Sequence, residues 1–371
     1  MMSARFLTVV LERAFNMRDG FGREIDYMRI SVIDSCNLNC YYCNPCDNNE
    51  HCHALNILSV KEVLGIVRAA TRLGIKHFRL TGGEPLLHPQ LDEMVLQIKK
   101  IPGVSSVSLT TNAVLLVQHA KWLKEAGIDS INVSLDTIDA SEYERITKKP
   151  LLEEVKHGIN AAIECGIRVK INVVLTPQTD VVALTRYVAK KGTDIRFIEM
   201  MPVGEGHTNG VEPYKKVIGT LSKLYGEPCR INTEKTKEIN SGNDKRKIPD
   251  NGPAEYYIFP ELGIRVGLIQ AIHGKFCDTC NRIRVTADGR LMPCLGSSVT
   301  MDLVPDSWDF ADDVEKDFSI VRALRAAIKA KPRCHNFNDN AVTYTKTTET
   351  KTTEIEAAEV NAARNMSRIG G

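Results

Sequence analysis

Short apolar runs alternate with longer amphipathic stretches along the chain up to residue 201. The short runs are rich in β-branched side chains and have the length of strands, whereas the longer stretches repeat their apolar positions with a helical period. The predicted strands are residues 27–32, 77–81, 107–111, 130–136, 168–175 and 195–201. The predicted helices are residues 60–73, 91–100, 118–126, 153–164 and 181–190. This alternation predicts an α/β fold, a partial (β/α)6 TIM-like barrel whose parallel strands are covered by helices.

Segments of unusual chemistry follow the carboxyl ends of these strands. A cysteine-rich segment follows the first strand, TGGEP the second, TTN the third, SLD the fourth and MMP the sixth. Parallel α/β folds carry their chemistry at the carboxyl ends of the strands. We therefore expect these segments to meet at one mouth of the barrel.

The alternation stops after Gly204, and a smaller, antiparallel α+β region is predicted beyond it. Its elements are a helix, a polar run, two strand-like runs, a hairpin with a DG turn and a last helix, at residues 213–226, 232–247, 256–259, 264–269, 282–294 and 316–330. Residues 341–362 are rich in Thr, Glu and Lys and are typical of a low-complexity segment. The predicted domains are an N-terminal extension, the barrel, a C-terminal region that carries a second group of cysteines, and a tail ending in Gly-Gly, at residues 1–26, 27–205, 206–340 and 341–371.

Composition and charge are those of an ordinary globular protein. The 371 residues include 48 Lys and Arg against 46 Asp and Glu, with 43% hydrophobic and 25% charged residues. This near balance implies no nucleic-acid partner and no anionic-membrane partner. The N-terminal apolar run has no A-x-A-like cleavage site, and no segment reaches the roughly 18 apolar residues of a spanning helix. The cytoplasm is the expected compartment.

Most of the eleven cysteines fall into two groups, which favours metal binding over disulfides. Cys36, Cys40 and Cys43 read C-x3-C-x2-C, and the second group, Cys277, Cys280 and Cys294, reads C-x2-C-x13-C. A structural zinc site requires four ligands. Three thiolates on a four-iron cluster leave one iron open to a non-protein ligand, which chemistry at iron requires.

An electron-transfer cluster with Cys46 as fourth ligand is the competing interpretation of the first group. This sequence lacks the last spacing and the proline of the bacterial ferredoxin pattern C-x2-C-x2-C-x3-C-P. The remaining cysteines are expected to be packing residues or spare thiols: Cys46, Cys52, Cys165, Cys229 and Cys334.

The segments CNLNCYYC and RLTGGEPLL together resemble the radical S-adenosylmethionine (SAM) enzymes. FCDTCNRIRVTADGRLMPCL and the terminal GG are similar to one family among them, the lyases that cyclise GTP at the start of molybdenum cofactor biosynthesis. The resemblance implies two [4Fe–4S] clusters, one on each cysteine group, with SAM on the open iron of the first. It also implies conversion of GTP to (8S)-3′,8-cyclo-7,8-dihydro-GTP.

The resemblance further assigns residues to ligands. Tyr42, Gly83, Ser134 and Met201 match SAM-contacting positions, and glycine at 83 would let the main chain approach the methionine part of SAM. The expected GTP contacts are Arg29, Arg79, Thr110, Lys170, Arg282 and Arg284. Guanidinium groups match phosphate oxygens, and Arg282 and Arg284 alternate along one strand and so share a face.

The chain end carries a further expectation. From the residues alone a frayed terminus is expected, but the resemblance implies that Gly370 and Gly371 arrange the catalytic site together with Arg284. Two glycines could thread a narrow channel, where the terminal carboxylate would pair with a barrel arginine. The expected partners besides GTP are an electron donor and, in the pathway, the downstream cyclic pyranopterin monophosphate synthase; a homodimer is left open.

Alternatives and departures accompany this interpretation. A radical SAM enzyme that acts on a peptide or another substrate, and a nonenzymatic iron–sulfur or zinc protein, are the alternative functions. Ala113 stands where TTNG would place glycine, so the loop must avoid a positive φ or accept strain. The extra thiols and imidazoles of NPCDNNEHCH could capture the wrong metal during assembly.

Overall fold

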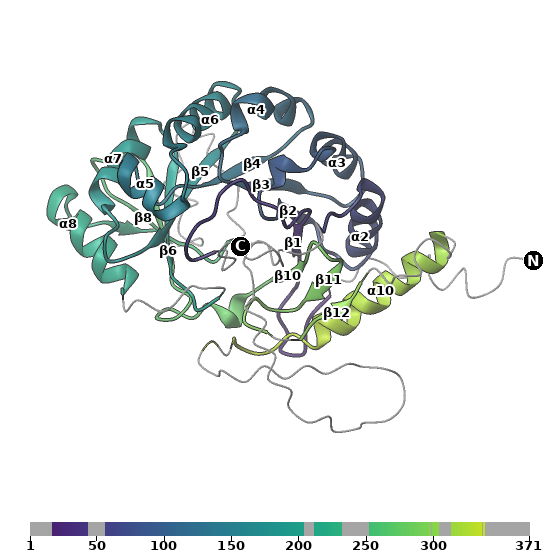
Figure 1. The fold of residues 1–371 in the computed structure, drawn as a ribbon. Helices are drawn as coiled ribbons and strands as arrows, with labels where there is room; N and C mark the ends of the chain where they lie inside the picture. The colour runs from purple at the N-terminus through teal and green to yellow at the C-terminus, as the bar shows by residue number, and fades with distance from the viewer. Residues whose placement is uncertain are drawn as a thin grey trace, which may run out of the picture. The chain divides into compact units, whose positions relative to one another are not determined.

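Parallel strands joined by helices make up the chain from residue 27 to residue 199 (Figure 1). The structure, a computed structural model, describes residues 17–43, 56–203, 211–231, 252–297, 299–303, 313–335 and 337. The first strands and helices are β1 (Tyr27–Ser31), α2 (Val60–Arg72), β2 (His77–Thr81), η1 (Pro85–Leu87), α3 (Leu91–Lys99), β3 (Ser106–Thr111), α4 (Leu116–Glu125), β4 (Ser130–Ser134), α5 (Ala140–Thr147), α6 (Leu152–Glu164), β5 (Val169–Leu175), α7 (Val181–Lys190) and β6 (Asp194–Glu199). All six predicted strands and five predicted helices are present, and α5 is an addition. The predicted α/β class is confirmed.

The C-terminal elements are shorter and partly antiparallel. They are η2 (Tyr214–Ile218), α8 (Gly219–Tyr225), β7 (Cys229–Arg230), β8 (Glu255–Ile258), β9 (Arg265–Ile269), η3 (Cys277–Thr279), β10 (Arg282–Val285), β11 (Arg290–Met292), β12 (Met301–Asp302) and α10 (Asp313–Lys329). The hairpin predicted from the DG turn is the antiparallel pair β10–β11. The segment 341–362 lies outside the described residues.

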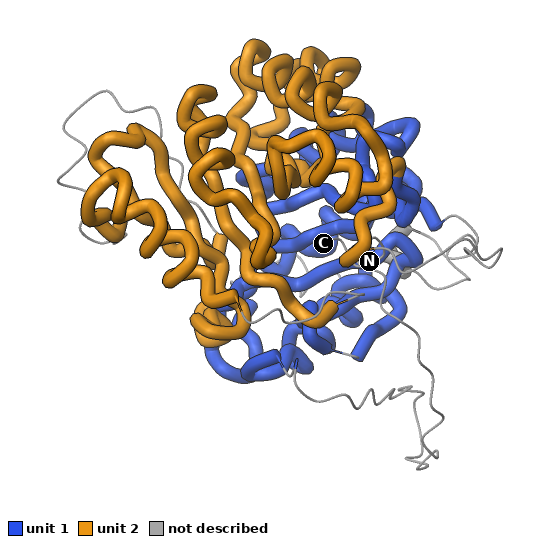
Figure 2. Tube along the Cα trace, turned by 60° about the vertical axis from the view of Figure 1, so that its left-hand side comes forward, with its two compact units in different colours: residues 1–36, 48–107, 280–371 blue, residues 37–47, 108–279 orange. Residues whose placement is uncertain are grey.

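The chain divides into two compact units that interleave in sequence (Figure 2). Unit 1 comprises residues 1–36, 48–107 and 280–371, and unit 2 comprises residues 37–47 and 108–279. The strand order in unit 1 is β12-β11-β10-β1-β2, and in unit 2 it runs from β3 through β4, β5, β6, β9 and β8 to β7. The predicted domain boundaries stay a prediction.

The sequence predicted a separate antiparallel region for the C-terminal strands, but these strands do not form one by themselves. Strand β10 pairs in parallel with β1 within unit 1, and β9 pairs in parallel with β6 within unit 2. Each strand also has an antiparallel neighbour, β11 and β8 respectively. Local turn signals reveal such hairpins, but they do not specify which distant strand completes the other edge.

Apolar and polar side chains alternate along the parallel strands, and this alternation defines two faces in each unit. In unit 1, Met28 and Ile30 are fully buried, and they alternate with Arg29. In unit 2, Ile131 and Val133 are fully buried on either side of Asn132. A parallel sheet covered by helices on both faces reads as a continuous apolar run. The alternation therefore indicates that each unit has one apolar face and one polar face.

Amphipathic helices cover the apolar face. Helix α2 begins with a capping box, in which the Ser59 hydroxyl accepts from the Glu62 backbone N–H and the Glu62 carboxylate accepts from the Ser59 N–H at 2.6 Å. Its buried positions follow a helical period. Within unit 1, α10 packs beside α2, and Arg72 forms an ion pair with Asp317 at 2.7 Å.

The TTNA loop after β3 adopts a strained backbone conformation, one of the two possibilities that the sequence allowed. Ala113 has φ of 65°, in the left-handed region that glycine occupies at low cost. Its N–H donates to the Thr111 hydroxyl at 3.0 Å, and the next N–H, that of Val114, donates to the Asn112 side chain at 3.0 Å. Helix α6 passes so close that a Cβ at Gly158 would lie 2.3 Å from the Ala113 carbonyl oxygen. Side-chain hydrogen bonds and close packing thus hold a conformation that alanine disfavours.

Among the described residues, no helix combines the length and the apolar character needed to cross a bilayer.

Candidate active site

The TGGEP segment of unit 1 holds the backbone that leads into Cys36. The N–H of Gly83 donates to the Ile33 carbonyl at 2.7 Å, and the N–H of Glu84 donates to the Ser35 carbonyl at 2.8 Å. A Cβ at Gly83 would lie 2.1 Å from the Ser35 oxygen, so no other residue fits. Glycine is therefore required at position 83 because the backbone at Ser35 approaches it closely. The SAM contact expected at Gly83 is a separate prediction.

The rest of the first cysteine group belongs to unit 2, where the loop is tied to α5. The Asn39 N–H donates to the Thr147 carbonyl at 3.0 Å, and the Tyr41 N–H donates to the Ile146 carbonyl at 3.1 Å. The Cys43 N–H donates to the Cys40 carbonyl at 2.9 Å, which turns the chain between these two cysteines. Cys46 and Cys52 lie outside the described residues.

Tyr42 is anchored through its hydroxyl, which donates to the Asp136 carboxylate in the SLD segment after β4. The second oxygen of Asp136 accepts the Val174 N–H of β5 at 2.7 Å. Burial raises the pKa of Asp136 to about 6, against the lowering effect of these two hydrogen bonds. Burial, together with the Asp136 charge, also raises the pKa of Tyr42 well above its usual value. Sequence analysis selected Tyr42 and missed Asp136, although SLD ends a predicted strand as the other selected segments do.

Four arginines and a tyrosine share one face of unit 1. Arg29 in β1 lies opposite Arg284 in β10 and opposite Arg79 in β2, and Tyr27 lies opposite Arg282. We call these four arginines the arginine row: Arg29, Arg79, Arg282 and Arg284. The predicted shared face of Arg282 and Arg284 is consistent with this register.

Charge repulsion within the arginine row is visible in the pKa values. Burial and then the charges of Arg284 and Arg79 hold the pKa of Arg29 well below its usual value. Burial and the charge of Arg282 lower the pKa of Arg284 to about 10. A face that disfavours its own positive charges gains stability when an anion binds there.

Tyr27 lies among these guanidinium groups. Its hydroxyl accepts a hydrogen bond from the Arg79 Nε. The guanidinium carbon of Arg282 lies 5.3 Å from the centroid of its ring, and that of Arg79 lies 5.9 Å away. Burial alone would raise the pKa of Tyr27, but the charges of Arg79, Arg282 and Arg29 outweigh it and lower the pKa to about 8. Sequence analysis did not select Tyr27, because a tyrosine at a strand start is common in cores.

The corresponding polar face of unit 2 carries Thr110, Asn132 and Lys170. These three residues lie side by side on β3, β4 and β5. The Lys170 ammonium is buried and lies 5.9 Å from the centroid of the Tyr256 ring. Asn132 is 5% exposed, and no described residue offers its Oδ1 a hydrogen bond. A buried amide oxygen without a partner costs stability and is expected to have a ligand.

The next row of the same face carries Ser134, Asn172 and Arg196 on β4, β5 and β6. Ser134 is exposed at the end of its strand, and the Arg196 Nε donates to the Asn172 Oδ1 at 3.0 Å. Met201 follows β6 and is half-buried. Arg196 was not selected from the sequence, although it is a cation within an apolar strand as Arg29 and Arg79 are.

In the second cysteine group, Cys277 in η3 belongs to unit 2, whereas Cys280 and Cys294 belong to unit 1. Burial raises the pKa of the Cys280 thiol, but the charges of Lys331 and Arg282 outweigh it, so the pKa is lowered. A lowered pKa favours the thiolate that iron binds. The residues around Cys280 therefore fit an iron–sulfur cluster. In the part of the chain that the structure describes, no three cysteine, histidine or carboxylate side chains are gathered as a metal site.

Gly370 and Gly371, the expected catalytic tail, lie outside the described residues. The other single cysteines within the described residues are free thiols: Cys165, Cys229 and Cys334.

A cavity of about 240 Å³ lies in unit 2 beside the SLD segment. Four of its lining residues are acidic: Asp136, Asp139, Glu142 and Asp180. Carboxylates repel a polyphosphate, whereas the arginine row attracts one. The acidic lining therefore makes this cavity unsuited to a polyphosphate.

Comparison with known proteins agrees with these features. A family model described as the Radical SAM superfamily matches residues 30–183, and one described as Molybdenum Cofactor Synthesis C matches residues 193–337. The structure is similar to the crystal structure of Streptococcus suis SuiB bound to the precursor peptide SuiA, with a TM-score of 0.51 and 14% identity over 78% of this chain and 62% of that one. At that identity the likeness concerns the fold alone. The fold and the cysteine motifs define a radical SAM enzyme with a molybdenum cofactor synthesis region.

Close relatives narrow this class. The GTP 3′,8-cyclase of Clostridium perfringens (strain SM101 / Type A) is 35% identical over 324 residues, which cover 86% of this chain and 95% of the relative. The GTP 3′,8-cyclase of Peptoclostridium acidaminophilum is 37% identical over 328 residues, 86% of this chain and 94% of the relative. The chain belongs to the GTP 3′,8-cyclase family.

Proposed function

We propose that the arginine row of unit 1 binds the triphosphate of GTP, the substrate that gives the family its name. The radical SAM-dependent cyclisation of GTP, at the start of molybdenum cofactor biosynthesis, is the reaction of this chain. The observation that carries the phosphate assignment is the register that aligns Arg29, Arg79 and Arg284 across three paired strands. Guanidinium forks match phosphate oxygens, and the anion relieves the repulsion among them.

The two iron–sulfur clusters and SAM supply the electron transfer and the radical chemistry when they are bound. Cys36, Cys40 and Cys43 would hold one cluster, and Cys277, Cys280 and Cys294 the other. The chain's own task is to orient the nucleotide, to place SAM and to exclude water. For SAM we propose contacts from Tyr42, Gly83, Ser134 and Met201. The hydrogen bond from Tyr42 to Asp136 would fix the tyrosine ring between its two neighbouring cysteines.

Binding measurements on the anaerobically reconstituted protein test the phosphate assignment. Arg79→Ala should weaken GTP binding roughly 10- to 100-fold, the cost of losing hydrogen bonds to a charged group, and should leave guanosine binding nearly unchanged. Arg145→Ala is the matched control, because Arg145 is exposed and pairs with Glu142 on α5. Equal weakening of GTP and guanosine binding would contradict a phosphate contact.

In unit 2, Thr110, Asn132 and Lys170 are proposed as further polar contacts to the nucleotide. Asn132→Leu keeps the size of the side chain and removes the buried amide. It should leave the free energy of unfolding equal or higher, because the amide oxygen has no partner within the described residues, yet raise the KM for GTP roughly tenfold. Thr185→Val, which changes a buried hydroxyl on α7, is the control. An unchanged KM in Asn132→Leu would remove this residue from the site.

The reaction requires a one-electron donor, and the cyclic pyranopterin monophosphate synthase is the proposed consumer of the product. The cytoplasm is the proposed compartment, because free thiols and iron–sulfur clusters persist in a reducing environment.

A further inference from the structure

Lys331 is a buried ammonium held by the two segments that carry Cys280 and Cys294. Its side chain is among the most buried charged groups of the described residues, with the residue 2% exposed. The Nζ donates to the Arg282 carbonyl at 2.7 Å and to the Pro293 carbonyl at 2.8 Å. Arg282 lies two residues after Cys280, and Pro293 immediately precedes Cys294. One side chain therefore joins the two strand ends at which these cysteines stand.

The register of β10 and β11 explains why one ammonium can reach both carbonyls. Arg284 pairs with Met292, and Val285 pairs with Leu291. Continued toward the strand ends, this antiparallel register brings residue 282 opposite residue 294. The two carbonyls that Lys331 binds thus belong to facing ends of one hairpin.

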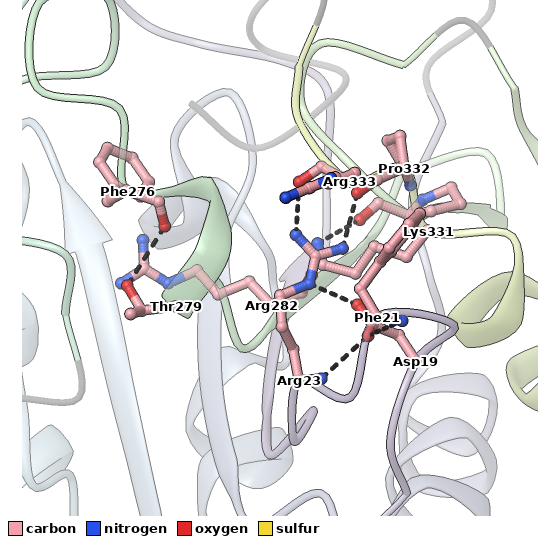
Figure 3. A network of polar contacts seen from close by, with 10 residues as sticks. Asp19, Phe21, Arg23, Phe276, Thr279, Arg282, Lys331, Pro332 and Arg333 are labelled. Carbon is pink, nitrogen blue, oxygen red and sulfur yellow. Dashed lines mark hydrogen bonds and ion pairs between the residues drawn. The ribbon is translucent and has the colours of Figure 1, made fainter.

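A separate set of contacts fixes the backbone beside Lys331 (Figure 3). Arg23 donates to the Pro332 carbonyl at 2.6 Å and to the Arg333 carbonyl at 2.8 Å. Its Nε donates to the Asp19 carboxylate, which also accepts the N–H groups of Phe21 and Arg23, at 2.9 and 3.0 Å. Arg23 and Asp19 are both buried. We call Asp19, Arg23 and the two carbonyls the N-terminal strap, because it fastens residues 332 and 333 to a turn near the start of the chain.

Two carbonyls do not neutralise a buried ammonium. An ammonium has three donors, and burial of its charge requires a compensating negative charge nearby. The thiolates of Cys280 and Cys294, carried by the two segments that Lys331 joins, would supply this negative charge in the cluster-bound protein. Hydrogen bonds to sulfur and the net charge of the surroundings set the reduction potential of an iron–sulfur cluster.

We propose that Lys331 is a positioning residue of the auxiliary cluster: it joins the segments that carry Cys280 and Cys294, and its buried positive charge raises the reduction potential of the cluster. The N-terminal strap holds Lys331 in place for this role. The inference rests on the proposal that Cys277, Cys280 and Cys294 ligate that cluster.

Reduction potentials of the anaerobically reconstituted full chain test the inference. The signal of the auxiliary cluster is assigned in the Cys36→Ala/Cys40→Ala/Cys43→Ala variant. Lys331→Met should shift the oxidised-to-reduced ratio at a fixed potential at least tenfold toward the oxidised form, which corresponds to about 59 mV for a one-electron couple. Lys331→Arg, which keeps the charge, should shift it less. Lys329→Met removes the same charge from an exposed position two residues away and should have no effect.

Arg23→Gln tests the strap with Lys331 unchanged, and it should move the potential in the same direction by a smaller amount. Selective loss of the auxiliary iron in Lys331→Met, with the first cluster retained, would also support the inference. Full iron content with an unchanged potential in Lys331→Met would overturn it, as would equal loss of folded protein and of both clusters in the Met and Arg variants. Retention of all iron in Cys280→Ala would instead overturn the ligand assignment, so the two failures are distinguishable.

Discussion

Arg29 of β1 and Arg284 of β10 lie directly opposite each other on paired parallel strands, although they are 255 positions apart in the sequence. This proximity disfavours the charge of Arg29, since burial and then the charge of Arg284 lower the pKa of Arg29. Repulsion between the two guanidinium groups therefore costs stability when no anion is bound.

This relationship predicts opposite effects of one substitution on stability and on binding. Arg29→Met should raise the free energy of unfolding of the free protein by about 1 kcal/mol, because an apolar side chain of similar length replaces a repelled charge. The same variant should lose most of the stabilisation that GTP gives to the native protein. Denaturation with and without GTP measures both quantities. A variant that is destabilised when free would contradict the repulsion.

Tyr27 makes stability depend on pH in the alkaline range. Burial raises the pKa of Tyr27, but the charges of Arg79, Arg282 and Arg29 lower it by a larger amount. The pKa therefore falls from 10.0 to about 8. The folded state then releases the proton before the unfolded state does, so the free energy of unfolding should rise by about 2–3 kcal/mol between pH ~8 and ~10 and this gain is lost as the pH falls through ~8. Tyr27→Phe should remove this rise. Unfolding curves across this range, compared between the two proteins, measure it, and parallel profiles would contradict the shifted pKa.

The first cysteine group predicts which thiols matter for SAM cleavage. Alanine at Cys36, Cys40 or Cys43 should abolish reductive SAM cleavage, because a cluster with two protein thiolates is not retained. Cys46→Ala should keep it, because three ligands remain. Iron content and release of 5′-deoxyadenosine are the measurements. If Cys46→Ala alone lost the cluster, the electron-transfer interpretation would return.

The second cysteine group should be separable from the first. The triple variant Cys277→Ala/Cys280→Ala/Cys294→Ala is expected to contain about half the iron of the wild type, as one of two four-iron clusters is lost. Slow SAM cleavage uncoupled from GTP should persist, while GTP cyclisation stops. Product analysis under anaerobic conditions decides this, and continued cyclisation would show that the second group is not needed.

Removal of Gly370 and Gly371 should leave both clusters and SAM binding intact but abolish GTP cyclisation. Glycines can enter a channel too narrow for other residues, and the terminal carboxylate can pair with an arginine. Iron content and cyclised product are measured for the truncated protein beside the full chain. Full activity after truncation would make the tail dispensable.

The sequence by itself determined the order and type of the elements and the residues with metal chemistry. Helical and strand periods are local properties, so the six βα-type strands and their helices are readable from apolar spacing alone. The hairpin of β10 and β11 follows from its DG turn. Two groups of three cysteines stand out because thiols clustered at such spacing are typical of metal sites.

Only the tertiary structure decided which distant residues share a site. The parallel pairing of β10 with β1 sets Arg284 beside Arg29, and no local pattern encodes that register. The same holds for Asn132 between Thr110 and Lys170. Lys331 had no sequence signal at all, since a lysine after a helix is normally a solvated charge. Its burial and its two carbonyl partners arise from packing between segments far apart in the chain, where the cost of a buried polar group selects the contacts that satisfy it.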